Sequence, residues 1–310
     1  MDGIERVYLG ENRMLVRTRW GGWVEAPTFN IDVALPTIRD GIIEPWTTRL
    51  VQEMLQPGQV YFNAGANFGY YVALGGQIVG ENGLVFAVEP NIHILPYLVR
   101  TVYWSGIIGR TKIFDVALGK EDGEDVVFEF DPQYLGGGTR VDVNDRPNQH
   151  FREAPFFADG VWNPENIRRS FGNNHEFSPF LQAAVKFSAP MRCIDTLCAR
   201  VTLDLLHLDI EGSEALALSG ARETIARSPQ LRLITEWSAE HHASGSAQSR
   251  AAFDEVWRFL EAMGFRVRHL EPRQAGDGAI FVSAPLSYED MTQRAIHGDY
   301  VWVRPQHDPW

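Results

Sequence analysis

Two short stretches of this chain place glycines and an acid where a ligand could bind. The first, VYFNAGANFGYYV at 60–72, runs from a strand pattern through Gly65 and Gly69 into a helical pattern. Small side chains in such a turn let the backbone bend sharply and approach a ligand. The second is an apolar strand pattern ending at Glu89, whose carboxylate could accept both hydroxyls of a ribose. Together they predict a site for a nucleotide-type cofactor.

The glycine loop differs from a dinucleotide-binding loop. Its glycines are not spaced as G-x-G-x-x-G, and the stretch from Ala64 to Gly69 contains no basic residue to meet a pyrophosphate. A cofactor without phosphates therefore fits better. For the loop taken alone, a purely structural explanation stays open, because a strand that leads directly into a helix also needs a tight turn.

A second group of reactive side chains lies in LHLDIEGSE at 206–214. On a strand His207 and Asp209 point to the same face, and Asp209 is nearer the carboxyl end, where α/β sheets bind ligands. Either side chain could take a proton from a hydroxyl, as could Glu236 at the end of the next strand. Each also has a structural interpretation, His207 as a hydrogen-bonded core histidine and the acids as charges near helix N-termini.

The acids raise the question of a metal site. Asp209, Glu211 and Glu236, with the histidines at 241–242, could supply the oxygen-rich coordination that hard divalent cations prefer. These residues lie on different elements, however, and their spacing does not require them to converge. We therefore expect no bound metal.

The remaining sequence alternates strand and helix patterns, which is typical of a parallel sheet covered by helices on both faces. Strand patterns lie at 60–63, 84–89, 111–116, 186–193, 205–210, 231–236, 265–270 and 279–283, and helical patterns at 46–55, 68–79, 92–105, 213–227 and 249–263. Residues 1–43 form short β-like runs between breaks. Residues 131–190 are rich in Gly, Pro and aromatics but lack periodicity. We expect one α/β domain at 44–310 with roughly seven strands, a β-rich N-terminal extension at 1–43 and an inserted lid at about 131–190.

Composition narrows the class of protein. With 310 residues, 45% hydrophobic and 22% charged, the chain reads as a soluble globular protein without an apolar run long enough for a bilayer. A net charge of −12 argues against binding nucleic acid or anionic lipid. The charged N-terminus lacks the apolar core of a signal peptide, so we expect a cytoplasmic protein. The sequence does not define the oligomeric state.

Several motifs together resemble the FkbM-type methyltransferases, a class I S-adenosylmethionine-dependent family. They are GIIEPWTTRLVQEMLQPGQVYFNAGANFGYY, LVFAVEPN, VALG, CIDTL and LHLDIEGSEALALSGA, within about 40–120 and 190–237. The resemblance implies a seven-stranded Rossmann-like sheet with S-adenosylmethionine in the crevice above Gly65. It further implies that Glu89 binds the ribose and that the loop after Asp115 lies beside the adenine. The implied cofactor-binding residues are Asn63, Gly65, Asn67, Gly69, Glu89 and Asp115.

The chain departs from the family pattern at two positions. The family usually has Asp where this chain has Asn63, and Lys where it has His207. An amide at position 63 keeps hydrogen-bonding capacity but loses the charge that would favour the ammonium and sulfonium of the cofactor.

The resemblance implies methyl transfer to oxygen. We expect an S-adenosylmethionine-dependent O-methyltransferase whose acceptor is a hydroxyl of a sugar, in a glycan or a glycosylated metabolite. One alternative is O-methylation of a natural product without a sugar, and another is transfer to nitrogen or a carboxylate. A further alternative is a non-catalytic module with this fold, which would bind or scaffold partners in a biosynthetic assembly.

Overall fold

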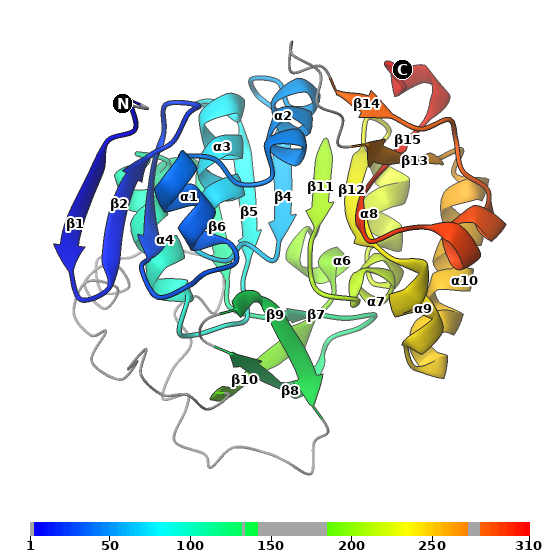
Figure 1. Ribbon diagram of the computed structural model, residues 1–310. Coiled ribbons are helices and arrows are strands. Elements are labelled where there is room, and N and C mark those ends of the chain that lie inside the picture. The colour runs from blue at the N-terminus through cyan, green and yellow to red at the C-terminus, as the bar shows by residue number, and fades with distance from the viewer. Residues whose placement is uncertain (1–2, 132–133, 142–184, 272–279) are drawn as a thin grey trace.

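The apolar stretches on either side of the glycine loop form a strand and a helix near the centre of the molecule (Figure 1). The computed structural model describes residues 3–131, 134–141, 185–271 and 280–310. Strand β4 (Val60–Ala64) and helix α3 (Tyr70–Val79) lie where the sequence predicts them. Along β4, Tyr61 packs into one hydrophobic cluster, whereas Phe62 and Ala64 pack into another. The strand is therefore covered on both faces, as a central strand of a parallel sheet should be.

The main sheet has eight strands among the described residues. Across the sheet they are β14 (Phe281–Val282), β13 (Arg266–Glu271), β15 (Gly298–Val303), β12 (Arg232–Trp237), β11 (Leu205–Leu208), β4, β5 (Leu84–Val88) and β6 (Thr111–Phe114). The run from β12 to β6 is parallel, and β15, β13 and β14 pair in antiparallel fashion. The predicted mostly parallel, Rossmann-like α/β class is confirmed. Seven of these strands are four to six residues long, and β14 has only two.

Helices cover both faces of this sheet (Figure 1). One face packs against α2 (Pro45–Met54), α3 and α4 (Leu95–Trp104), and the other against α7 (Glu214–Ser219), α8 (Arg222–Arg227) and α10 (Ala247–Ala262). The shorter helical segments are η1 (Ile108–Arg110), α6 (Ile194–Leu197), α9 (Ala239–Ser244), η4 (Asp290–Arg294) and η5 (Pro305–His307). Within the described ranges, no helix is both long and apolar enough to cross a membrane.

Three local predictions differ from the structure. Strand β15, which sequence periodicity did not identify, lies between β12 and β13. The helix predicted over 213–227 is two helices, because the chain turns at Gly220, where a Cβ atom would lie 2.2 Å from the carbonyl oxygen of Gly119. The strand predicted over 186–193 forms, as β10 (Val185–Arg192), but it belongs to a second sheet.

This second sheet has the order β7 (Ala117–Leu118), β10, β8 (Gly123–Asp131) and β9 (Tyr134–Val141). It lies below the carboxyl ends of the parallel strands in the view of Figure 1. Strands β9 and β10 fall at the two ends of the predicted lid, and residues 142–184 between them lie outside the described residues. The second sheet therefore covers the edge of the main sheet where ligands are expected.

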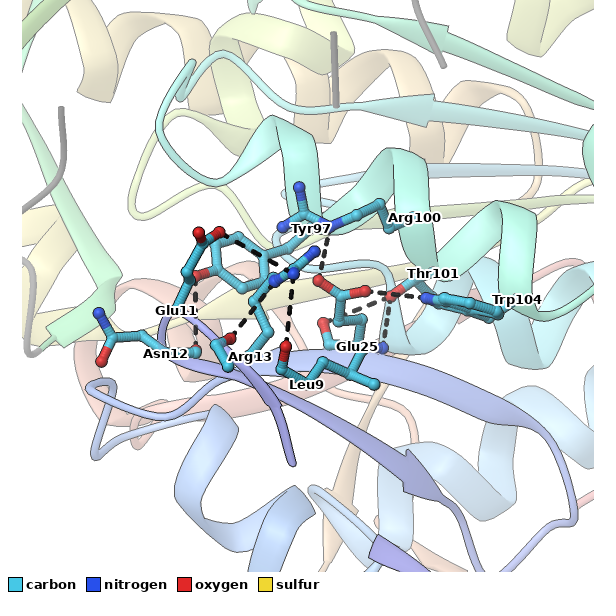
Figure 2. Close-up of polar contacts among 10 residues, drawn as sticks. Leu9, Glu11, Asn12, Arg13, Glu25, Tyr97, Arg100, Thr101 and Trp104 are labelled. Carbon is cyan, nitrogen blue, oxygen red and sulfur yellow. Dashed lines mark hydrogen bonds and ion pairs between the residues drawn. The ribbon is translucent and has the colours of Figure 1, made fainter. Parts of the chain in front are cut away.

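The N-terminal region forms an antiparallel sheet of β1 (Arg6–Gly10), β2 (Arg13–Arg17) and β3 (Trp23–Pro27), followed by α1 (Ala34–Asp40). A buried ion pair joins this sheet to α4 (Figure 2). The Nε atom of Arg100 lies 2.5 Å from Oε1 of Glu25, and both side chains are fully buried. The indole of Trp104 donates to Oε2 of Glu25 at 2.8 Å. The backbone N–H of Glu25 donates to the hydroxyl of Thr101 at 2.9 Å. These contacts fix the N-terminal sheet against the main domain.

Candidate active site

A large cleft opens at the carboxyl ends of β4, β5 and β11. It encloses about 1080 Å³, including the part open to solvent. Its walls come from the loops that follow four parallel strands, at 65–68, 88–91, 116–118 and 209–213. Phe128 and Phe187 of the second sheet also line it, as do Val33, Ile43 and Glu44 from the region before β4. The cleft therefore lies at the position where open α/β sheets bind their ligands.

The glycine loop has the backbone geometry that its sequence predicts. Gly65 has a φ of +76°, and a Cβ atom there would lie 1.8 Å from the carbonyl oxygen of Asp209. Gly69 has a φ of +94° and precedes α3, where a Cβ atom would lie 2.9 Å from Leu98. Asn67 between them also has a left-handed backbone, with φ +48°. Both glycines are thus required, because a side chain would be strained and would collide with its neighbours.

Glu89 forms the wall of the cleft beside this loop. Its Oε2 accepts the backbone N–H of Asn67 and its Oε1 that of Asn91, each at 2.8 Å. The side chain is 7% exposed, and burial raises the pKa of Glu89 to about 7. Each carboxylate oxygen can accept a second hydrogen bond, so the residue fits the two hydroxyls of a ribose. Asp115 is buried at the end of β6, and the three residues after it, 116–118, line the cleft.

Asn63 and His207 are buried and are among the predicted site residues that do not line the cleft. Asn63 is 1% exposed, and neither its Oδ1 nor its Nδ2 has a hydrogen-bond partner among the described residues. His207 is also 1% exposed; its Nδ1 lies 3.0 Å from the hydroxyl of Tyr61, and its ring packs edge-on against Tyr71 at 4.9 Å. Burial lowers the pKa of His207 to about 4. It is therefore neutral at pH 7, in the environment of a hydrogen-bonded core histidine.

The predicted acids at the ends of β11 and β12 do converge. Carboxylate oxygens of Asp209, Glu211 and Glu236 lie within 4.8 Å of one another. A hydrogen bond links Asp209 to Glu236, and Oε1 of Glu236 lies 2.9 Å from Nε2 of His297. Burial and the neighbouring Glu236 raise the pKa of Asp209 well above its ordinary value, and burial and Glu211 raise that of Glu236 to about 7. Asp209 and Glu236 thus form a carboxyl pair that can hold one proton between them.

Glu236 also reaches a second, smaller cavity of about 360 Å³ next to the cleft. The walls of this cavity include Trp237, Ser238 and His242. The rings of Trp237 and Phe253 stack with centroids 4.0 Å apart, and the ring of His242 packs beside both, at 5.3 and 5.0 Å. The side chain of His241 lies outside the described residues.

Sequence reasoning missed several residues of the site. Glu44 and Tyr71 line the cleft, and the hydroxyl of Tyr71 donates to Oε2 of Glu44 at 2.7 Å. Glu214 is buried, and its Oε1 accepts the backbone N–H groups of Ile210 and Gly212 at 2.9 and 3.3 Å, which holds the loop after β11. The three residues are the Glu of EPW at the start of α2, the second tyrosine of FGYY and the third acid of DIEGSE. None of these residues has a spacing from other polar residues that would predict a role in the site.

The family model described as Methyltransferase FkbM domain matches residues 63–267, which is more than half of the chain. The chain belongs to the FkbM methyltransferase family. It is thus a methyltransferase that depends on S-adenosylmethionine, and the resemblance seen in the sequence is confirmed. The cleft fits this cofactor, because its glycine loop allows close approach and the Glu89 oxygens retain acceptor capacity for a ribose.

Solved methyltransferase structures are similar to this FkbM methyltransferase at low sequence identity. The O-methyltransferase TomG from Streptomyces achromogenes, solved with S-adenosylmethionine, is 8% identical, covers 86% of this chain and 82% of its own, and has a TM-score of 0.39. A Thermotoga maritima S-adenosylmethionine-dependent O-methyltransferase is 12% identical, covers 97% of this chain and 85% of its own, and has a TM-score of 0.36. An Aquifex aeolicus S-adenosylmethionine-dependent methyltransferase is 16% identical, covers 74% of this chain and 83% of its own, and has a TM-score of 0.35. A search of curated protein sequences gives no significant match. The family assignment therefore rests on the family model.

Proposed function

We propose that this methyltransferase acts on a hydroxyl oxygen, and that the acceptor is a sugar in a glycan or a glycosylated metabolite. The observation that carries the proposal is the Asp209–Glu236 pair. Its oxygens lie at the carboxyl ends of neighbouring strands, with Asp209 in the wall of the cleft. A hydroxyl must lose its proton when its oxygen is methylated, and a carboxyl pair with a raised pKa can accept that proton near neutral pH.

The chain would contribute binding, alignment and proton transfer. When bound, S-adenosylmethionine supplies a methyl group on a sulfonium. The backbone of the glycine loop and the carboxylate of Glu89 hold the nucleoside part on the β5 side of the cleft. The Asp209–Glu236 pair lies on the β11 and β12 side, so an acceptor hydroxyl bound there would be held between the pair and the methyl group. Alignment of this kind can supply most of the rate enhancement of an in-line displacement.

His207 has a different place in this proposal. Its ring packs against Tyr71 and its Nδ1 faces the hydroxyl of Tyr61, beneath the wall of the cleft. A group that does not reach the cleft cannot receive the proton of an acceptor held there. We therefore assign His207 a role in positioning Tyr71 and leave the base to Asp209 and Glu236.

A sugar suits several of the groups that line the cleft. Carboxylates such as Asp209 and Glu211 accept hydrogen bonds from several hydroxyls at once. Phe128 and Phe187 stack with ring centroids 5.2 Å apart and both line the cleft, so they offer an apolar surface for a sugar ring. A natural product without a sugar would use the same apolar surface but would leave more of the acids without hydroxyl donors.

The same acids could instead bind a divalent cation, as three oxygen ligands within 4.8 Å would allow. We propose that they act without one, because Asp209 and Glu236 bond to each other and Glu236 also contacts His297. Dialysis of the purified protein against a chelator should leave turnover unchanged. A loss of turnover that Mg²⁺ or Mn²⁺ restores would assign the three acids to a metal site.

The test of the base uses methyl-labelled S-adenosylmethionine, a panel of glycosides with their aglycones, and mass spectrometry of the products. With an accepted glycoside, Asp209→Asn and Glu236→Gln should each lower kcat by roughly 10²–10⁴ while calorimetry shows unchanged cofactor affinity. Asp125→Asn, which changes an exposed carboxylate on β8, should behave as wild type. Methylation of the aglycone or of nitrogen would contradict the acceptor proposal. A wild-type protein without cofactor affinity would contradict the assignment of the glycine loop and Glu89 to the cofactor.

A further inference from the structure

The negatively charged groups of the cleft include one that neither the ribose nor the acceptor accounts for. We infer that Glu44, which lies before the region that the family model matches, binds the ammonium group in the amino-acid part of S-adenosylmethionine. The inference concerns the cofactor, so it does not depend on which acceptor the enzyme methylates. It rests on the backbone of Glu44, its hydrogen bond and the charges around it.

The backbone of Glu44 has an unusual conformation. Its φ and ψ are +40° and +71°, in the left-handed region that residues other than glycine seldom occupy. Glu44 is the N-cap residue of α2, and its carboxylate makes no capping hydrogen bond to the helix. The conformation instead presents the side chain to the cleft, which it lines next to Ile43. Strain of this kind often accompanies a binding role.

A hydrogen bond fixes the carboxylate beside the glycine loop. The hydroxyl of Tyr71, in the first turn of α3, donates to Oε2 of Glu44 at 2.7 Å. A second contact between the same helices joins the hydroxyls of Thr48 and Tyr70 at 3.2 Å. Among the described residues, Oε1 of Glu44 has no hydrogen-bond donor. One oxygen is therefore held in place while the other can accept from a ligand.

The excess of acids in the cleft favours a cationic group of the ligand beside Glu44. Its lining includes four acids, Glu44, Glu89, Asp209 and Glu211, and within the described part of the chain no Lys, Arg or His. Glu89 accepts two backbone N–H groups at the ribose position, and Asp209 is bonded to Glu236. Glu211 belongs to the same acid group as Asp209. Glu44 is the remaining carboxylate, and S-adenosylmethionine carries an ammonium that must be matched when it leaves water.

The order of the strands places Glu44 at the correct end of the cofactor. Glu89 follows β5, the glycine loop follows β4, and Asp209 follows β11, which are neighbours in that order. Thr47, three residues after Glu44, donates its hydroxyl to Asp299 at the start of β15, and β15 lies beyond β12 and β11 in the sheet, so the start of α2 lies on the side away from Glu89. A nucleoside bound at Glu89 would direct its amino-acid part across the glycine loop toward Glu44. Asn63 below the loop offers no charge for the ammonium.

Binding measurements on the full chain test this assignment without an acceptor. Calorimetry would compare S-adenosylmethionine, S-adenosylhomocysteine and methylthioadenosine, which lacks the amino-acid part. Glu44→Gln keeps an acceptor for Tyr71 but removes the charge. It should raise the Kd of the two ligands with an ammonium by roughly tenfold or more and leave methylthioadenosine unchanged. Glu53→Gln, at the exposed end of α2 where it pairs with Arg49, is the matched control and should change none of the three.

A second variant guards against an effect of misfolding. Tyr71→Phe keeps the charge of Glu44 but removes the hydrogen bond that fixes it. Tyr71→Phe should raise the Kd of S-adenosylmethionine and S-adenosylhomocysteine by a smaller factor than Glu44→Gln does. The Kd of methylthioadenosine should not change. Unchanged affinity of Glu44→Gln for S-adenosylmethionine would overturn the assignment, and so would an equal loss for all three ligands. A failure to methylate any sugar hydroxyl would contradict only the acceptor proposal.

Discussion

Asn63 and His207 lie directly opposite each other on β4 and β11, two adjacent parallel strands at the centre of the main sheet. Both side chains are 1% exposed, and His207 is neutral because burial lowers its pKa to about 4. The sequence resemblance implies that the family usually has Asp and Lys at these two positions. We interpret them as a matched change, in which a neutral pair replaces a pair of opposite charges. Two independent losses of function would not need to fall on facing residues.

A double-mutant cycle would test this interpretation. Asn63→Asp alone buries a carboxylate opposite a neutral ring, and His207→Lys alone buries an ammonium and loses the hydrogen bond to Tyr61. Each should lower the free energy of unfolding by roughly 3–5 kcal/mol. The double variant should recover about 0.5–3 kcal/mol of the summed cost, as measured by urea denaturation. Strictly additive costs would show that the two positions are not coupled.

The acids around the cleft should make stability depend on pH. Burial raises the pKa values of Glu89, Glu214 and Glu236 to about 7, from an ordinary value of 4.5. Between these values the native state keeps protons that the unfolded chain has released, so the stability present below pH 4.5 is lost as the pH rises toward 7. Without cofactor, the free energy of unfolding should be larger at pH 5.5 than at 7.5.

The free energy of unfolding should fall by about 1.4 kcal/mol per pH unit for each proton that the native state retains. Glu214→Gln keeps the acceptor for Ile210 and Gly212 but removes one titrating group, so it should flatten the profile. Glu53→Gln, which changes an exposed carboxylate, should leave the slope as it is. A stability that rises between pH 5.5 and 7.5 would contradict the assignment of these acids as buried and protonated.

A comparison of Gly65 with Gly58 separates the cost of a steric collision in the loop from the cost of a positive φ. Gly65 and Gly58 have similar φ values, +76° and +83°, but a Cβ atom at Gly65 would lie 1.8 Å from the carbonyl oxygen of Asp209, whereas at Gly58 nothing lies within 4 Å. Gly58→Ala should cost about 1 kcal/mol from backbone strain. Gly65→Ala should cost roughly 3 kcal/mol or more and abolish cofactor binding in calorimetry. Equal costs would show that the loop can move away from Asp209.

The Glu25–Arg100 ion pair should be a major determinant of stability. Glu25→Ala leaves the guanidinium of Arg100 buried without its carboxylate and should lower the free energy of unfolding by about 3–5 kcal/mol. The exposed pair of Arg17 and Glu5, at 3.1 Å, is the control, and Glu5→Ala should cost at most about 1 kcal/mol. Denaturant titration of the two variants would compare them. A small effect of Glu25→Ala would mean that the N-terminal sheet is not fixed through this contact.

The local elements could largely be predicted from the sequence. The strand, loop and helix around Gly65 follow from apolar periodicity and from glycines that tolerate positive φ. The alignment of Glu89 and Asp209 at one edge follows from their places at the carboxyl ends of parallel strands. The helix predicted before Pro57 and Gly58 is α2, and the helix at 249–263 is α10 with a shift of two residues at its start.

Only the tertiary structure decided how these elements are joined. Strand order and register depend on hydrogen bonds between segments far apart in the sequence, which local periodicity does not encode. This is why β15 between β12 and β13, and β10 in the second sheet, differ from expectation. Long-range pairing also placed Asn63 opposite His207 and brought Glu44 to Tyr71. The residue types define the chemistry available to this methyltransferase, and the packing of distant segments determines which of these groups face the cleft.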